Sequence, residues 1–356
     1  MADSKLSLFE NDKFYYVEGN TNVKNVVKTL ATEICINATE AYKWTLVYPT
    51  KETDITNFAL IKAVTTFGKE FHVRLYREKD CTTHMEMAIG SDIVTINKSI
   101  IDKTSGELKE IEVTDLNEET CNTPCRLAWY TKPMAGVKDW LPIQYWMNVT
   151  KDAVNVVLRG DPSPDVYPYT NYLTGYAYLG SLTKIEEDSD DDKEYNFGIT
   201  TSSNIEPVFE RKFGERTATG TTDVCMIANK IGMPMQPHIP AFYTAHQFMD
   251  KCNVDGGSRW NNKKYQFSDI TLIHPVEMER GKMQNILVGD GYGIFDADRL
   301  VLKRNTDNEE NYKKFKITAP YNFLNNTANN SYCIAIRCYK DSGDFYCPMP
   351  PEHQEP

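Results

Sequence analysis

Cysteines are the first residues in this chain whose type and spacing could support chemistry. Cys121 and Cys125 form a C-x3-C pair, and Cys333 and Cys338 lie close together further along. Four thiolates of this kind would suit a structural zinc ion. However, the odd spacing of the second pair turns its side chains to opposite faces of the strand expected there. We therefore expect no zinc site.

Histidines and carboxylates offer a second set of metal ligands. His238 and His246 precede His274, which is followed by Glu277 and Glu279. No H-E-x-x-H helix pattern connects them. Packing or surface positions are the simpler interpretation, so the sequence predicts no metal ion and no other cofactor.

A glycine-rich segment, Gly289-Asp-Gly-Tyr-Gly293, lies close to Asp296 and Asp298. It has neither the G-x-x-x-x-G-K-[ST] nor the G-x-G-x-x-G spacing that binds phosphates. Its glycines favour a turn. No G-x-S-x-G elbow occurs and no Cys/His couple stands out. We predict no catalytic residues and interpret the chain as a non-enzyme.

Aromatic residues form the most suggestive cluster. Five tyrosines fall within twelve residues: Tyr167, Tyr169, Tyr172, Tyr176 and Tyr178. Tyrosine is enriched at protein interfaces because its ring is large, stiff and amphipathic, and the same properties suit sugar-binding surfaces. The alternative is a segment that covers the hydrophobic core. The sequence leaves both open.

Composition limits the function classes. Lysine and arginine total 39 against 50 aspartate and glutamate, a net charge of −11, which argues against a nucleic-acid binder. The first eleven residues are polar and no apolar run is long enough to span a bilayer, so we expect neither a secretory leader nor membrane insertion. Nine irregularly spaced cysteines indicate folding in a reducing compartment.

The elements that must position these residues are mostly strands. Residues 20–34 predict an amphipathic helix, since Val23, Val27 and Leu30 follow the helical period. Many short runs of β-branched and aromatic residues then alternate with turn residues. Residues 143–158 predict a β-hairpin around a Thr-Lys-Asp corner. The expected fold class is α+β, mostly β, with antiparallel sheets in a sandwich or barrel-like arrangement.

Three parts are expected along the chain. Residues 1–184 form an N-terminal β-rich domain, and residues 185–240 form an acidic and proline-rich linker. The acidic run 185–194 is interpreted as a solvated loop, since it lacks the glycine and the ligand spacing of a calcium loop. Residues 241–356 form a C-terminal β-rich domain. It ends in an extended tail from Cys347 to Pro356 that contains four prolines.

Several segments resemble a known class of proteins. They are FYYVEGNTNVKNVVKTL, WTLVYP, LPIQYWMNVTKDAVNVVLRGDPSPD, YAYLGSL, DGYGIFDADRLVLKRN and KFKITAPYNFLNNTANNSYCIAIRCY. Together they look like virion structural proteins of large tailed phages that infect Gram-positive hosts. The resemblance implies a tail, baseplate or neck component that assembles in the host cytoplasm and resides in the virion. It implies other virion proteins as partners and several copies in a symmetric ring, and it supplies no catalytic residues.

Two other function classes remain open from the sequence. A receptor- or glycan-binding module of the tail tip would use the tyrosine cluster to bind a host surface glycan. A metal-dependent hydrolase of the host wall is the third class, and the missing ligand set counts against it.

Overall fold

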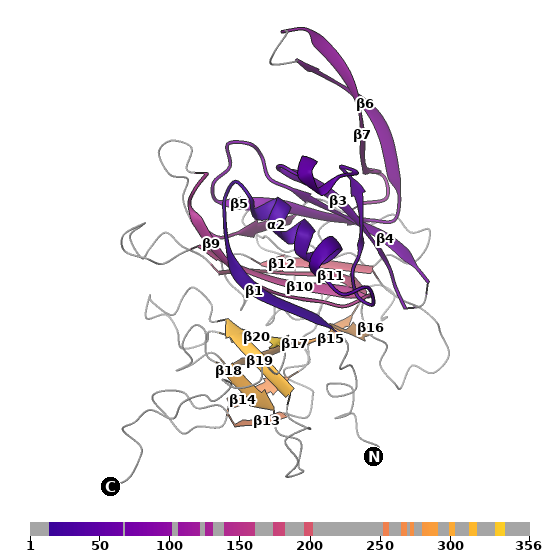
Figure 1. The fold of residues 1–356 in the computed structure, drawn as a ribbon. Helices are drawn as coiled ribbons and strands as arrows, with labels where there is room; N and C mark the ends of the chain where they lie inside the picture. Colours follow the sequence, from indigo (N-terminus) through magenta and orange to yellow (C-terminus); the bar gives the residue numbers. More distant parts are fainter. Residues whose placement is uncertain are drawn as a thin grey trace.

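The computed structural model describes part of the chain. The described residues are 14–66, 68–101, 106–121, 125–130, 139–160, 174–181, 196–201, 252–255, 265–268, 271–273, 280–290, 299–302, 313–318 and 332–338. Among them the chain is mostly β, and every pair of neighbouring strands runs antiparallel (Figure 1). This confirms the predicted β-rich, antiparallel character.

Two five-stranded sheets make up most of the described N-terminal part. Sheet A has the order β1 (Tyr15–Asn22), β9 (Pro142–Val149), β10 (Ala153–Gly160), β11 (Thr174–Ser181) and β12 (Asn196–Thr201). Sheet B has the order β2 (Thr45–Tyr48), β3 (Phe58–Val64), β4 (Glu70–Tyr76), β5 (His84–Gly90) and β8 (Cys125–Ala128). A short 3-10 helix, Glu52–Asp54, precedes β3.

The predicted hairpin over 143–158 is present as β9 and β10. Val149 pairs with Val154, and the ladder continues to Ile143 opposite Gly160. The Thr150 hydroxyl closes the corner by accepting a hydrogen bond from the backbone N–H of Ala153 at 2.8 Å. Local turn chemistry therefore sets the register of the two central strands.

A helix with the predicted bounds of 20–34 is not confirmed. Residues 20–22 belong to β1, α2 covers Val26–Thr32, and a π-helical turn covers Glu33–Asn37. Asn25 stands at the N-cap of α2 without a capping bond from its side chain, and its backbone N–H donates to the Asn22 side chain at 3.0 Å. Pairing with β9 extends β1 into the region where the helical period suggested the first turn.

One hydrophobic core lies between α2, sheet A and sheet B. Val26 and Leu30 of α2, Phe71 and Val73 of β4, and Val156 of β10 are all fully buried within it. Trp44 links the layers, because its indole N–H donates to the carbonyl oxygen of Thr150 at 2.9 Å while its ring meets Phe71 edge-on at 5.3 Å. Burial of these side chains is the main stabilising contribution to the fold.

The described C-terminal strands form a closed barrel and a separate pair. The barrel has the order β13 (Cys252–Asp255), β14 (Tyr265–Ser268), β17 (Ile286–Asp290), β20 (Tyr332–Cys338), β19 (Lys313–Thr318) and β18 (Arg299–Leu302). β15 (Thr271–Ile273) pairs with β16 (Arg280–Lys282). The predicted linker over 185–240 needs a correction, because its residues 196–201 form β12 and pair with β11. The remainder of that linker and the tail Cys347 to Pro356 lie outside the described residues.

A long hairpin leaves the body of the protein. Its strands are β6 (Ile93–Ile101) and β7 (Leu108–Leu116), which pair along their whole length and form a sheet of their own. We call this hairpin the arm. Figure 1 shows that it projects beyond the two five-stranded sheets.

Candidate functional site

The predicted aromatic surface is only partly within the described residues. Tyr176 and Tyr178 lie on β11 and are 1% and 0% exposed. They are core residues here, so for these two the expectation of an exposed binding surface needs correction. Tyr167, Tyr169 and Tyr172 lie outside the described residues. Successive side chains of a strand point to opposite faces, so Tyr176 and Tyr178, which are two residues apart on β11, lie on the same face of sheet A. Both are buried, so this face is covered.

Buried and half-buried polar groups meet between sheet A and the C-terminal part of the chain, and we call them the polar seam. Its members are Asn148, Asn155, Tyr176, Tyr178, Gln284, Asn285 and Arg337. Asn148 and Asn155 face each other across β9 and β10. The sequence held a signal for them, because each asparagine has apolar residues on both sides within its strand.

Hydrogen bonds satisfy the centre of the polar seam. The Asn155 amide donates to the Asn148 side-chain oxygen and to the backbone oxygen of Gln284, both at 2.8 Å. The Tyr176 hydroxyl donates to the Asn155 side-chain oxygen at 2.8 Å. Burial, with a smaller contribution from Tyr178, raises the pKa of Tyr176 well above its usual value. Tyr176 is therefore a neutral donor at every physiological pH.

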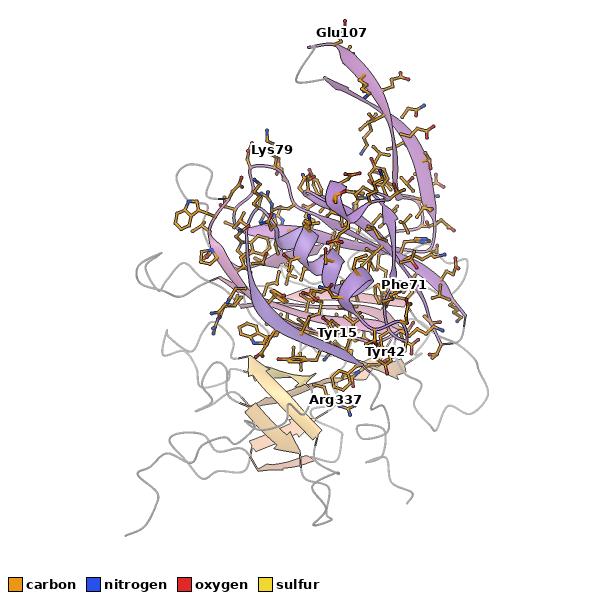
Figure 2. All side chains as sticks on the ribbon, viewed as in Figure 1. Tyr15, Tyr42, Phe71, Lys79, Glu107 and Arg337 are labelled. Carbon is orange, nitrogen blue, oxygen red and sulfur yellow. The ribbon has the colours of Figure 1, made fainter. Side chains whose placement is uncertain are left out.

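The polar seam also joins sheet A to the C-terminal strands. The Asn148 amide donates to the backbone oxygens of Asn285 and Arg337 at 3.2 and 3.1 Å. Asn285 has a φ of 57°, a left-handed conformation that asparagine tolerates better than most residues. The Arg337 guanidinium lies 4.8 Å from the centre of the Phe14 ring (Arg337 is labelled in Figure 2). We interpret the seam as a structural contact, because its polar groups are turned away from solvent.

The base of the arm is fixed to sheet B. Asp115 of β7 accepts from the Arg74 guanidinium at 3.3 Å through both carboxylate oxygens, and both side chains are less than one-fifth exposed. Leu116 is 2% exposed and packs with Leu60 and Ala88 on the outer face of sheet B. The arm therefore leaves the body in a defined direction.

Beyond this base most described side chains of the arm are exposed, although Val113, which pairs with Ile96, is 8% exposed. Ile96 on β6 is 38% exposed and Leu108 on β7 is 77% exposed. Figure 2 shows side chains standing out along both strands as far as Glu107 at the far end. Strands of nine residues reach about 30 Å. An isolated two-stranded hairpin is marginally stable in water, so an arm of this length is suited to gaining a partner.

The two faces of the arm differ in charge. Alternation and register place Ile96, Lys98, Lys109 and Ile111 on one side, the lysine face. They place Asn97, Ser99, Glu110 and Glu112 on the other, the glutamate face. Among the described residues no third strand pairs with either outer edge of the hairpin. The backbone N–H and C=O groups along these edges are therefore open to pairing with a strand of another chain.

The other predicted candidates fall mostly outside the described residues. Cys121 has a free thiol of intermediate burial, and its pKa is raised by burial against a smaller opposing effect of Arg74. The side chains of Cys125, Cys333 and Cys338 are not described, nor are the predicted histidine ligands and the aspartates after Gly293. Within the described part, no group of three or more His, Cys, Asp and Glu side chains is placed to bind a metal ion.

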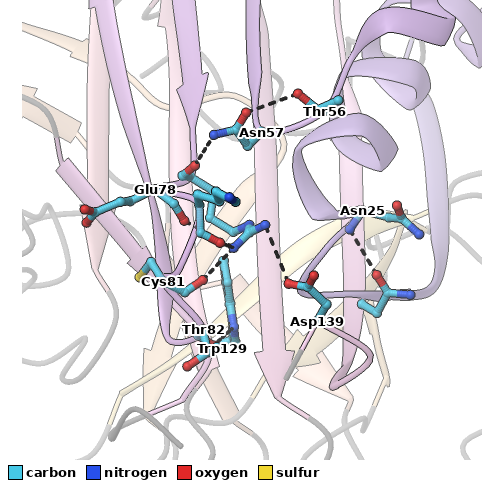
Figure 3. A network of polar contacts seen from close by, with 11 residues as sticks. Asn25, Thr56, Asn57, Glu78, Cys81, Thr82, Trp129 and Asp139 are labelled. Atoms are coloured by element: carbon cyan, nitrogen blue, oxygen red, sulfur yellow. Dashed lines mark hydrogen bonds and ion pairs between the residues drawn. The ribbon is translucent and has the colours of Figure 1, made fainter. Parts of the chain in front are cut away.

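A polar network, missed in the sequence, fixes the loop between β4 and β5 (Figure 3). The buried Arg77 guanidinium donates to the carbonyl oxygens of Glu78, Lys79 and Cys81 at 3.2, 2.9 and 2.8 Å. From the other side, the Trp129 indole N–H donates to the Thr82 carbonyl oxygen at 2.8 Å.

Cys81 and His84 meet at the end of this loop. The Cys81 Sγ lies 3.3 Å from Nδ1 of His84, and the same Nδ1 lies 2.9 Å from the Thr83 hydroxyl. The signal in the sequence was the spacing Cys-Thr-Thr-His, whose histidine begins a strand.

Comparison with protein-family models, with curated proteins and with solved structures found no match to this chain. None of the helices in the described part is both long enough and apolar enough to cross a membrane.

Proposed function

We propose that this chain is a non-enzymatic structural component of a tailed-phage virion, in the tail, baseplate or neck. The observation that carries the proposal is the arm, an exposed two-stranded hairpin whose base is fixed and whose length projects from the body. The sequence resemblance to virion proteins supplies the context. In this proposal the arm reaches a neighbouring subunit and holds it in the particle.

The chemistry of the arm suits this role. Open strand edges bind other chains through backbone hydrogen bonds, and side chains then set the specificity. The lysine face and the glutamate face can each meet a surface of the opposite charge. An interface with two different halves repeats head to tail and closes into a ring when the rotation allows. Other virion proteins and further copies of this chain are the proposed partners, and assembly takes place in the host cytoplasm.

Shortening the arm tests this proposal. Replacing residues 97–112 with Asn-Gly joins Ile96 to Val113, which already pair in register, through a two-residue turn. The base contacts of Asp115 and Leu116 stay in place, so the variant is expected to fold. In phage particles assembled with this variant as the only source of the protein, we expect incorporation to be lost.

A pair of point variants controls for general surface effects. Ile96→Lys changes an arm residue that is 38% exposed, and Ile36→Lys changes a residue that is 48% exposed on the π-helical turn. Only Ile96→Lys is expected to reduce incorporation, measured as copies per particle. Equal incorporation of the shortened arm and the wild type would contradict the proposal. Binding of the purified protein to host cells would instead favour a receptor-binding module.

A further inference from the structure

The arm has two outer edges, and the side chains along them differ. We propose that the β6 edge pairs antiparallel with the β6 edge of a second copy of this chain, about a two-fold axis at Asn97. The pairing rests on the proposed function, because it takes the arm as the element that reaches a neighbour. It adds the identity of the partner, the edge that is used and the register.

β6 is the less protected of the two edges. Of its nine residues only Lys98 carries a charge, and isoleucine, valine and threonine fill six positions. Four of the nine residues of β7 are charged: Lys109, Glu110, Glu112 and Asp115. Charged side chains along an edge strand discourage pairing with other chains, whereas β-branched residues favour it. The composition of the two strands therefore selects β6 as the edge that pairs.

The position of the arm on the body favours the same edge. β7 is the strand of the arm that makes the closer contacts with sheet B, through β2, β3 and β4. Its Asp115 is also bound to Arg74 of β4. The body therefore lies nearer to β7, and a strand of another chain has more room beside β6.

Full overlap of two β6 strands fixes the register. An antiparallel pair that joins all nine residues brings the central residue, Asn97, opposite Asn97 of the second copy. Lys98 then lies opposite Ile96, so that its aliphatic stem can cover the isoleucine. Thr95 lies opposite Ser99, and the two hydroxyls can form a hydrogen bond across the pair. No two like charges are opposed.

The other edge pairings are less favourable. Full overlap of two β7 strands would bring Glu112 opposite Glu112 of the second copy, and like charges directly opposite each other are destabilising. Pairing of β6 with β7 of the next copy would leave a free edge at each end, so the assembly would continue without closing. Pairing of β6 with β6 avoids both problems and closes after two copies.

The pairing converts two hairpins into one sheet with the strand order β7-β6-β6-β7. An isolated two-stranded hairpin is marginally stable in water, and a sheet of more strands with an apolar face is not. Because opposed residues of an antiparallel pair lie on the same face, the lysine faces of both copies form one surface and the glutamate faces form the other. Both surfaces stay available for contacts with further subunits.

Disulfide trapping in the purified full-length protein tests the position of the axis. Opposed Cα atoms in antiparallel strands lie about 4.5 to 5.5 Å apart, which suits a disulfide, so Asn97→Cys should give a covalent dimer under mild oxidation. Non-reducing electrophoresis measures the dimer. Mass spectrometry of the linked peptides distinguishes it from any disulfide of the native cysteines.

Glu112→Cys is the matched control for trapping. Glu112 pairs with Asn97 within the arm and is likewise exposed. In the proposed sheet, however, the two copies of this position are three strand spacings apart, roughly 14 Å, which is too far for a disulfide. We expect at least about 10-fold more dimer from Asn97→Cys, because only the axis brings two equivalent residues within disulfide range.

A second pair of variants tests the register and the direction of the strands. Thr95→Cys and Ser99→Cys should form a mixed dimer when the two proteins are combined. Neither should dimerise alone, because equivalent positions are offset by four residues, about 13 Å along the strands. Parallel pairing in register would instead link each variant to itself.

Charge at position 96 gives an independent check of the register. In the Asn97→Cys background, Ile96→Lys places a like charge opposite Lys98 of the second copy, and Ile96→Glu places an opposite charge there. Both variants lose the same exposed isoleucine. We expect trapping to fall with lysine and to be retained with glutamate.

Several outcomes would overturn the pairing. They are equal dimer from Asn97→Cys and Glu112→Cys, self-linking of Thr95→Cys, and equal trapping with lysine and glutamate at position 96. Preferential linking of Asn97→Cys to Glu112→Cys in a mixture would show head-to-tail addition of the arms instead.

Failure of the pairing can be told apart from failure of the proposed function, because trapping needs no particle. Virions that contain the chain but yield no trapped dimer with Asn97→Cys, when the purified variant yields none either, would overturn the pairing alone. A trapped dimer of the purified variant, together with virions that lack the chain, would overturn the virion role and leave the pairing in place.

Discussion

At the residue scale, buried amides and hydroxyls organise the contact between sheet A and the C-terminal strands. Asn155 lies at the centre, since its side chain accepts from Tyr176 and donates to Asn148 and to the backbone of Gln284. Groups of this kind cost free energy when they lose a partner in a buried place. The polar seam is therefore sensitive to single substitutions.

Tyr176→Phe should reveal this sensitivity. The variant keeps the ring but leaves the Asn155 side-chain oxygen without its donor, so we expect the free energy of unfolding to fall by about 1 to 3 kcal/mol. Tyr16→Phe is the matched control, because the Tyr16 hydroxyl donates to Glu18 at an exposed position. Urea unfolding of both variants measures the difference, and equal midpoints would contradict the role given to the seam.

His72 should make stability depend on pH. Burial, more than the opposing hydrogen bond to the Ser91 carbonyl oxygen, lowers the pKa of His72 from 6.5, and the nearby charges of Lys62, Glu70 and Asp92 act in smaller measure. The unfolded chain then binds more protons than the folded one near this pH. Stability is fully present above pH 6.5 and decreases as the pH falls through that value.

The measurement for His72 is the urea midpoint from pH 5 to 8. We expect His72→Gln to flatten the part of the curve around pH 6.5 relative to the wild type. A curve of the same slope in both proteins would show that other groups cause the dependence.

At the element scale, close approach between sheet A and β8 depends on glycine. A Cβ added at Gly160 would meet the backbone oxygen of Trp129 and the Tyr130 ring, and one at Gly175 would meet the backbone of Ala128. Backbone atoms in a packed core cannot shift without cost. These two glycines let the end of β8 lie directly against β10 and β11.

Gly160→Ala should therefore destabilise the protein by about 1 to 3 kcal/mol, the usual cost of overpacking a core. Gly19→Ala is the control, because its new Cβ would meet only the outer end of the Tyr145 side chain and no backbone atom among its nearest neighbours. Thermal unfolding compares the two. A smaller loss for Gly160→Ala than for Gly19→Ala would contradict the packing described for β8.

The elements also show where sequence reasoning succeeds. The hairpin over 143–158 was predictable because its turn, its alternation and its register are all local. The bounds of the helix over 20–34 were not predictable, because residues 20–22 extend β1 and pair with β9, more than a hundred residues away. The arm was not predicted, since periodicity does not say that a pair of strands extends away from its neighbours.

At the scale of the whole molecule, the predicted β-rich character is confirmed. The roles of individual residues could not be predicted, because they depend on contacts between distant parts of the chain. Tyr176 and Tyr178 illustrate the difference. Their enrichment in the sequence suits a surface or a core equally, and their burial in the folded chain decides for the core. Cys81 and His84 were overlooked because their pairing depends on a loop held by Arg77 and Trp129.

Cross-linking mass spectrometry of purified virions tests the proposed role of the molecule most directly. Lys98 and Lys109 on the lysine face offer amines for a cross-linker along the exposed arm. The proposal predicts that the chain is present in several copies per particle and that one of these lysines is linked to a neighbouring subunit. Virions without this chain, or arm lysines linked only within their own chain, would contradict it.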